Sequence, residues 1–234
     1  MPESICISSR FNGPRGSGNG GYSAGLVAGL LGGEAEINLR RPVPLDTELE
    51  VARDGDDVVR VLDGDALVAE GRAAEVELDL PAPVSPAEAR QAAQRFTGPP
   101  DDIFSRCFVC GKEREDSFGV FAGAVEGRPL VASPWTPPPW TADSSGRVRP
   151  EFVWATLDCP TYFAAYMDEE SAVSFLVQFT ARVGADVPAE AEHVVIAWPI
   201  ETEGRKRRAG SAVLSAEGEP LAVASALLVE ARAG

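Results

Sequence analysis

Apolar and polar positions follow the same order in the two halves of the chain. In the first half, small apolar residues fill positions 22–31 between two glycine-rich stretches, which predicts a helix covered on all sides by other parts of the chain. In the second half, the mostly apolar segment 150–166 begins with a proline and predicts a longer helix. Pro160 lies inside this segment, and we expect it to kink or split the helix.

A strand pattern follows the second predicted helix, at residues 172–182. There Val173, Phe175, Val177 and Phe179 alternate with positions that are on average more polar. Successive side chains of a strand point to opposite faces of a sheet, so this alternation predicts a strand with one strongly apolar face.

Two further segments repeat each other and define the halves. Segments 58–78 and 209–229 each place an acidic residue and a glycine between two strand patterns, which is typical of tight hairpin turns. Helix, strands and closing hairpin therefore occur twice. Residues 81–103 contain proline-rich breaks and one short helical pattern, which predicts a linker between an N-terminal half, 1–80, and a C-terminal half, 104–234. We predict an α+β fold with two antiparallel sheets, each wrapped around a central helix.

The charge balance narrows the possible partners. The 234 residues carry a formal net charge of −15, which repels a phosphate backbone, so we expect no nucleic-acid partner. The apolar runs fall well short of the ~20 residues that a membrane span needs, so we expect no membrane partner. Four cysteines are too few for a disulfide scaffold in a chain of this length, which fits a reducing compartment and predicts a cytoplasmic protein.

The spacing of the cysteines and of the one histidine predicts neither a metal site nor a catalytic triad. Cys107 and Cys110 have the spacing of a metal-ligand pair, but Cys6, Cys159 and His193 form no second close pair, so we predict no metal site. His193 lies in a strand pattern and is expected to be structural. With a single histidine so placed, the sequence does not support a Ser-His-Asp hydrolase.

Several short motifs resemble those of a known family. Segment 19–22, Asn-Gly-Gly-Tyr, before a small apolar helix and the Arg-Pro-Val-Pro within 37–45, resembles the opening of tandem hotdog acyl-CoA thioesterases. Segments 107–111 and 153–160, with the closing hairpin, resemble single hotdog thioesterase-like proteins. The resemblance covers most of the chain. It implies a double hotdog fold and an acyl-CoA substrate, with coenzyme A as part of that substrate and no separate cofactor.

Asp158 is the leading candidate for catalysis. It lies within an apolar helical segment, and a buried carboxylate is costly unless it is used or satisfied. The resemblance implies that an acid at this position acts as a nucleophile or as the general base for water. The alternative is a structural carboxylate that accepts hydrogen bonds from backbone N–H groups near Pro160.

Other residues would complete such a site. Gly20, Gly21 and Tyr22 open the first helix, and amides at a helix N-terminus can stabilise the negative charge that develops on a thioester carbonyl oxygen. The alternative is an ordinary glycine-rich helix start. By resemblance, Gln178 and Thr180 complete the site with Asp158. The alternative is that they are polar residues on the less buried face of their strand.

The chain has one concentrated group of positive charge, formed by Arg205, Lys206, Arg207 and Arg208. Such a group can bind the phosphates of coenzyme A. The alternative is a solvated loop between strands.

Three functional classes follow from these observations. The first is an acyl-CoA thioesterase-like hydrolase, and the second is a non-catalytic hotdog protein that binds acyl-CoA or another acyl ligand. The third is a partner-binding module that uses the proline-rich loop 135–140. The sequence also leaves a homo-oligomer open.

Overall fold

The computed structural model describes residues 3–55, 57–99, 102–168 and 172–232. Within them the strands are β1 (Ser4–Cys6), β2 (Ala35–Leu39), β3 (Glu48–Asp54), β4 (Val58–Asp63), β5 (Ala66–Ala73), β6 (Gly123–Ala124), β7 (Val131–Trp135), β8 (Ser174–Val183), β9 (His193–Glu203), β10 (Lys206–Ser215) and β11 (Pro220–Glu230). The α-helices are α1 (Gly20–Gly29), α2 (Pro86–Ala93) and α3 (Pro150–Ala165). No helix among these residues is long and apolar enough to cross a membrane.

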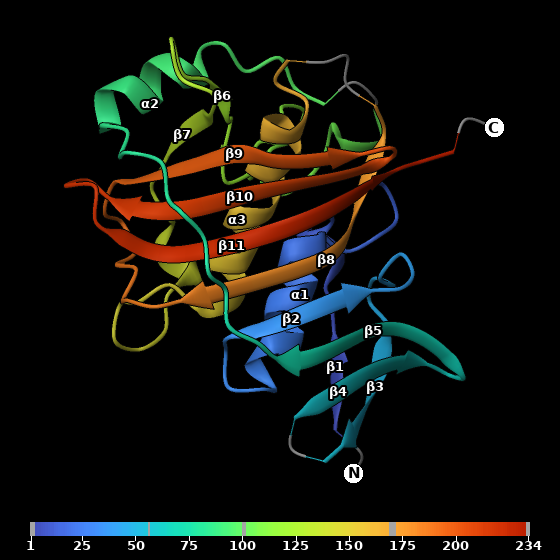
Figure 1. Ribbon diagram of the computed structural model, residues 1–234. Coiled ribbons are helices and arrows are strands. Elements are labelled where there is room, and N and C mark those ends of the chain that lie inside the picture. The colour runs from blue at the N-terminus through green and yellow to red at the C-terminus, as the bar shows by residue number, and fades with distance from the viewer. Residues whose placement is uncertain (1–2, 56, 100–101, 169–171, 233–234) are drawn as a thin grey trace.

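The strands form one continuous sheet, which corrects the prediction of two sheets. Its order is β1-β3-β4-β5-β2-β8-β11-β10-β9-β7-β6 (Figure 1). The two halves join where β2 pairs antiparallel with β8, from Ala35 opposite Ala181 to Asn38 opposite Gln178. An exposed strand edge presents unpaired N–H and C=O groups, and this pairing satisfies one edge of each half at once.

The two long helices pack against each other on one side of the sheet. Glycines permit the close approach: a Cβ atom added at Gly21 would lie 2.5 Å from the Trp154 carbonyl oxygen, and one at Gly25 would lie 2.7 Å from the Glu151 Cα atom. This contact explains why the first helical segment is rich in small residues.

Helix α3 runs without interruption from Pro150 to Ala165, so Pro160 does not split it. Residues on every side of this helix are buried, including Phe152, Leu157 and Pro160. Packing from α1 and from the sheet therefore overrides the local preference of proline.

Strand β8 differs from its predicted pattern. Phe179 is completely buried, whereas Phe175 is 38% exposed. The pairing with β11 shifts between Gln178 and Leu176, so the strand contains a bulge at Val177. One extra residue reverses the alternation of faces. The prediction that Phe175 and Phe179 share a buried face is therefore wrong.

The two closing hairpins form where the sequence predicts them. The β4–β5 turn contains Gly64 with φ of 57°, and the β10–β11 turn contains Gly218 with φ of 90°. Both angles lie in the left-handed region that glycine adopts readily.

Candidate functional site

A cavity of about 440 Å³ lies between the loop that precedes α1, the C-terminal part of α3 and the beginning of β8. Its lining is largely apolar and includes Phe163, Leu176 and Leu228. Asp158 also lines it, together with Cys159. A concave apolar site with few polar groups is the usual form of a small-molecule site.

Asp158 joins the two halves at the cavity wall. Its side chain extends from α3 and its Oδ2 atom accepts a hydrogen bond of 2.8 Å from the Gly21 N–H at the start of α1. Burial raises the pKa of Asp158 to about 7, against the lowering effect of the Gly21 hydrogen bond and with a smaller raising effect from Cys107. A carboxylate with a pKa near neutral is a better proton acceptor than an ordinary aspartate.

The start of α1 supplies backbone amides to this site. Asn19 is the N-cap, and its Oδ1 atom accepts a hydrogen bond of 2.8 Å from the Tyr22 N–H. Gly20 lines the cavity, and a Cβ atom added there would lie 3.2 Å from Asp158 Oδ2. The partial positive charge of a helix N-terminus favours a carboxylate at this position. The structure thus brings Gly20 and Gly21 to Asp158.

Tyr22 is placed differently. Its side chain is buried, and its ring stacks on Phe11 with centroids 4.5 Å apart. It is not among the residues that line the cavity. Its backbone amide helps to begin α1, while its side chain belongs to the core.

Gln178 and Thr180 do not join Asp158. Both lie outside the lining of the cavity, and Gln178 Nε2 donates a hydrogen bond of 3.2 Å to Asn38 Oδ1 on the adjoining strand β2. Phe179, between them, takes the buried face of β8. Because faces alternate along a strand, its two neighbours point the other way. This placement corrects the grouping of these two residues with Asp158.

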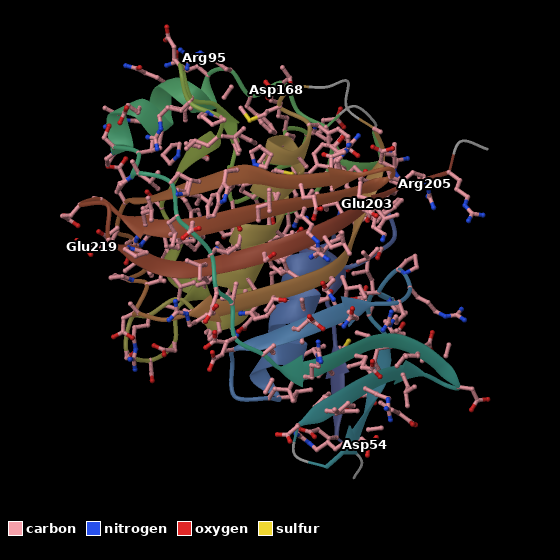
Figure 2. The ribbon with its side chains drawn as sticks, viewed as in Figure 1. Asp54, Arg95, Asp168, Glu203, Arg205 and Glu219 are labelled. Carbon is pink, nitrogen blue, oxygen red and sulfur yellow. The ribbon has the colours of Figure 1, made fainter. Side chains whose placement is uncertain are left out.

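The positive cluster 205–208 also lies outside the cavity lining. Figure 2 shows Glu203 and Arg205 at the tip of the β9–β10 hairpin. Each cationic side chain has an acceptor: Arg205 donates to the Glu230 carbonyl oxygen, Lys206 pairs with Glu203, Arg207 pairs with the Glu230 carboxylate and Arg208 pairs with Glu201. The hairpin turn thus places the cluster among acidic residues of neighbouring strands. Its role in phosphate binding stays a prediction.

Three other arginines line the cavity. They are Arg15, in the loop before α1, and Arg40 and Arg41, which follow β2. The sequence places Arg40 and Arg41 directly before the Pro-Val-Pro motif, but it gives no sign that Arg15 lies near them. Only the fold brings the two segments together.

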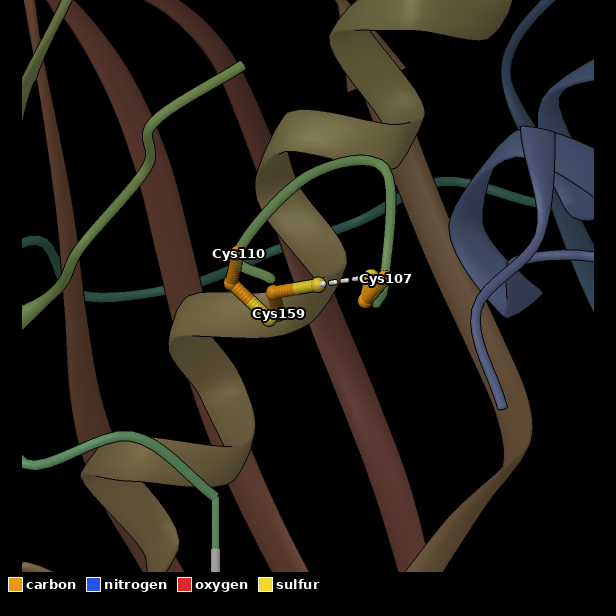
Figure 3. Close-up of side chains that lie close together, drawn as sticks. All are labelled: Cys107, Cys110 and Cys159. Atoms are coloured by element: carbon orange, nitrogen blue, oxygen red, sulfur yellow. Dashed lines mark hydrogen bonds between the residues drawn. The ribbon is translucent and has the colours of Figure 1, made fainter. Parts of the chain in front are cut away.

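Three cysteines converge beside Asp158. The sulfur atoms of Cys107, Cys110 and Cys159 all lie within 4.8 Å of one another, and those of Cys107 and Cys159 are 3.7 Å apart (Figure 3). All three are buried. Hydrogen bonds from Cys110 and Cys159 lower the pKa of the Cys107 thiol well below its usual value, and the same bonds raise the pKa of the two donors. The spacing of the cysteines does not predict this grouping, because Cys159 lies far from Cys107 and Cys110 along the chain.

His193 lies away from the cavity. Its Nε2 atom is 2.9 Å from the Pro188 carbonyl oxygen, and burial lowers its pKa. Its ring lies 5.8 Å from that of Trp135, which is also buried. At the other end of the proline-rich loop, Trp140 is 38% exposed, with the Arg10 guanidinium 4.2 Å from its ring centroid.

The fold is shared with solved structures over nearly the full length of the chain. A candidate thioesterase from Novosphingobium aromaticivorans is 12% identical, with a TM-score of 0.61 and coverage of 98% of this chain and 95% of that one. A candidate thioesterase II from Thermobifida fusca is 13% identical, with a TM-score of 0.60 and coverage of 98% and 93%. A hot dog-fold protein of unknown function from Alicyclobacillus acidocaldarius is 12% identical, with a TM-score of 0.57 and coverage of 99% and 93%.

No protein-family model and no curated protein sequence matches the chain. The similarity to solved structures therefore establishes the fold: the chain has a hotdog fold, as its motifs predict. Function has to be argued from the site.

Proposed function

We propose that the chain hydrolyses an acyl-CoA thioester in the cavity beside Asp158. One observation carries the proposal: a buried carboxylate of the second half lines an apolar cavity and meets the helix N-terminus of the first half, with Gly21 N–H 2.8 Å from Asp158 Oδ2. The proposal is supported by the presence of a carboxylate and the Gly20 backbone on the wall of the same cavity.

The reaction balances with water as the only co-reactant. Asp158 takes a proton from water, whose oxygen attacks the thioester carbonyl carbon. The C–S bond then breaks, and the proton held by Asp158 passes to the departing sulfur, which leaves as a thiol. General base catalysis of this type contributes about 10²- to 10⁴-fold to a rate.

The Gly20 amide is the proposed donor to the carbonyl oxygen. The Gly21 amide already donates to Asp158, whereas Gly20 lies at the cavity wall beside that carboxylate. The first amides of a helix have no acceptor within the helix, so this end is suited to developing negative charge.

The cavity lining offers one surface suited to the acyl chain of the substrate and another suited to the phosphates of coenzyme A. Apolar side chains such as Phe163, Leu176 and Leu228 suit an acyl chain. Arg40 and Arg41, on the cavity lining, suit the phosphates of coenzyme A, because arginine recognises phosphate through several N–H donors. The cluster 205–208 is the competing phosphate site.

The comparisons support the proposal through fold. Two of the solved structures similar to this chain over nearly its full length are named as candidate thioesterases. Hotdog proteins are nevertheless not all hydrolases, and one of the similar structures is of unknown function.

A non-catalytic acyl-CoA-binding protein is the second candidate. It is favoured by the low exposure of Asp158, 9%, and by the turning of Gln178 and Thr180 away from the cavity. In that case Asp158 would only fix α3 to α1 through Gly21.

Thiol release from a panel of acyl-CoAs distinguishes the two. We expect release by the unaltered protein and a loss of about 10²- to 10⁴-fold in Asp158→Asn, which keeps an acceptor for Gly21. Asp54→Asn, at the far end of the first half (Figure 2), is the matched control and should keep full activity. Equal rates in Asp158→Asn would remove Asp158 from the mechanism. Calorimetric binding without thiol release by either protein would favour the second candidate.

A further inference from the structure

The cysteine cluster has a geometry that the proposed hydrolysis does not use. Cys107 and Cys110 come from the loop before β6, and Cys159 comes from the middle of α3. Figure 3 shows the three side chains pointing toward one another from these two segments. Their sulfur atoms lie within 4.8 Å of one another.

The sulfur spacing fits a shared metal ion. Thiolates bound to a tetrahedral Zn²⁺ at about 2.3 Å lie about 3.8 Å apart. The Cys107 and Cys159 sulfurs are 3.7 Å apart, whereas a disulfide requires about 2.05 Å. The sulfurs can therefore surround one ion without a large movement of the backbone.

The surroundings of Cys107 suit a thiolate. The backbone amides of Val109 and Cys110 act on its side chain as hydrogen-bond donors. The Asn19 Nδ2 group lies 3.8 Å from both the Cys107 and the Cys159 sulfur. Donors aimed at sulfur stabilise the deprotonated form that binds metal.

Gly111 shows that the loop is tightly folded. A Cβ atom added there would lie 2.5 Å from the Cys107 carbonyl oxygen and 2.6 Å from the Cys107 nitrogen. The Gly111 N–H also donates a hydrogen bond of 2.8 Å to that carbonyl oxygen. A glycine is thus required for the turn that presents both cysteines of the pair.

We propose that Cys107, Cys110 and Cys159 bind one thiophilic divalent cation of the Zn²⁺ class, with a fourth coordination position open to the cavity. All three ligands line that cavity. Among the described residues, no His, Cys, Asp or Glu joins these three as a fourth member of the group. Three protein ligands with an exchangeable fourth are typical of open zinc sites. The ion would also fix the 107–110 loop to α3 next to Asp158.

The first test uses the full-length protein, reduced and freed of metal, and then titrated with Co²⁺ and with Zn²⁺. We expect about one ion per chain, with the thiolate-to-cobalt charge-transfer absorption and the visible bands of a tetrahedral site. X-ray absorption of the zinc form should give about three sulfur neighbours at about 2.3 Å. Failure to retain either ion, or two or fewer sulfur neighbours, would overturn the proposal.

Cysteine variants supply the second test. Cys159→Ser should lose stoichiometric Co²⁺ binding, whereas Cys6→Ser, which removes the exposed cysteine, should keep it. Circular dichroism establishes whether Cys159→Ser is folded, and the sulfur count in the unaltered protein decides the matter if it is not. Retention of the three-thiolate cobalt spectrum by Cys159→Ser would contradict the assignment. So would a protein whose Cys107 and Cys159 form a disulfide but which binds no ion after reduction.

Discussion

The contact between α1 and α3 gives the sharpest prediction, through Gly21→Ala. The added Cβ atom would lie 2.5 Å from the Asp158 Cβ atom and 2.5 Å from the Trp154 carbonyl oxygen. Favourable contacts between carbon atoms lie at about 3.5–4.0 Å, so the two helices must separate by roughly 1 Å. Such overpacking costs about 1–3 kcal/mol.

The separation of α1 from α3 in Gly21→Ala would also disturb the hydrogen bond between Gly21 and Asp158. A shift of roughly 1 Å would stretch the 2.8 Å hydrogen bond from Gly21 N–H to Asp158 beyond the normal range. A hydrogen bond to a charged group contributes about 1.5–3 kcal/mol. We therefore expect Gly21→Ala to lower both the free energy of unfolding and the rate of thiol release, since it displaces the carboxylate that is proposed to activate water.

Gly29→Ala is the matched control on the same helix. Gly29 is exposed, and nothing lies within 4 Å of the Cβ position. Alanine there should leave stability unchanged or raise it by up to ~1 kcal/mol, because alanine loses less backbone entropy on folding. Urea denaturation at neutral pH measures both variants. The close-approach argument fails if Gly21→Ala unfolds at the urea midpoint of the unaltered protein, or if both variants lose equal stability.

Three further predictions concern other parts of the molecule. Burial lowers the pKa of His193 below its unfolded value of about 6.5. The neutral, buried His193 therefore stabilises the fold above about pH 6.5, and this stabilisation is lost as the pH falls below 6.5, because the unfolded chain then takes up the proton first. The urea midpoint should therefore drop less between pH 8 and 5 in His193→Gln than in the unaltered protein, and parallel curves would refute this. Phe179→Ala, at a fully buried position, should cost about 3–5 kcal/mol, whereas Phe175→Ala should cost far less, and equal losses would contradict the bulge in β8. Arg41→Gln should raise KM for acyl-CoA at low salt with kcat unchanged, and more than Arg205→Gln does; the reverse order would return phosphate binding to the cluster 205–208.

The sequence predicts those features that are determined by residues close to one another along the chain. The small apolar residues predict a covered helix at 22–31, and the structure has it two residues earlier, at 20–29. The two hairpins follow from glycine after an acidic residue. The importance of Asp158 also follows locally, because an acid in an apolar helix needs a partner. Spacing gives no sign of its actual partner, the Gly21 amide, which is predicted only as a donor to the thioester carbonyl oxygen.

Other features depend on contacts between distant segments. The bulge at Val177 arises from pairing with β11 and reverses the faces of β8, which moves Gln178 and Thr180 out of the site. The joining of two predicted sheets into one depends on β2 meeting β8. Neither pairing leaves a signal in the alternation of apolar residues, because that alternation reports only which face is buried within one segment.

The middle of α3 explains why the site needs both halves of the chain. Asp158 and Cys159 are consecutive, so their side chains leave the helix about 100° apart and reach different neighbours. Asp158 reaches the amide of Gly21 in the first half, and Cys159 reaches the Cys107 loop in the second. Both still line one cavity, which the loop before α1 closes from the other side. A carboxylate from one half and a helix N-terminus from the other therefore meet in the candidate site, and neither half carries both groups.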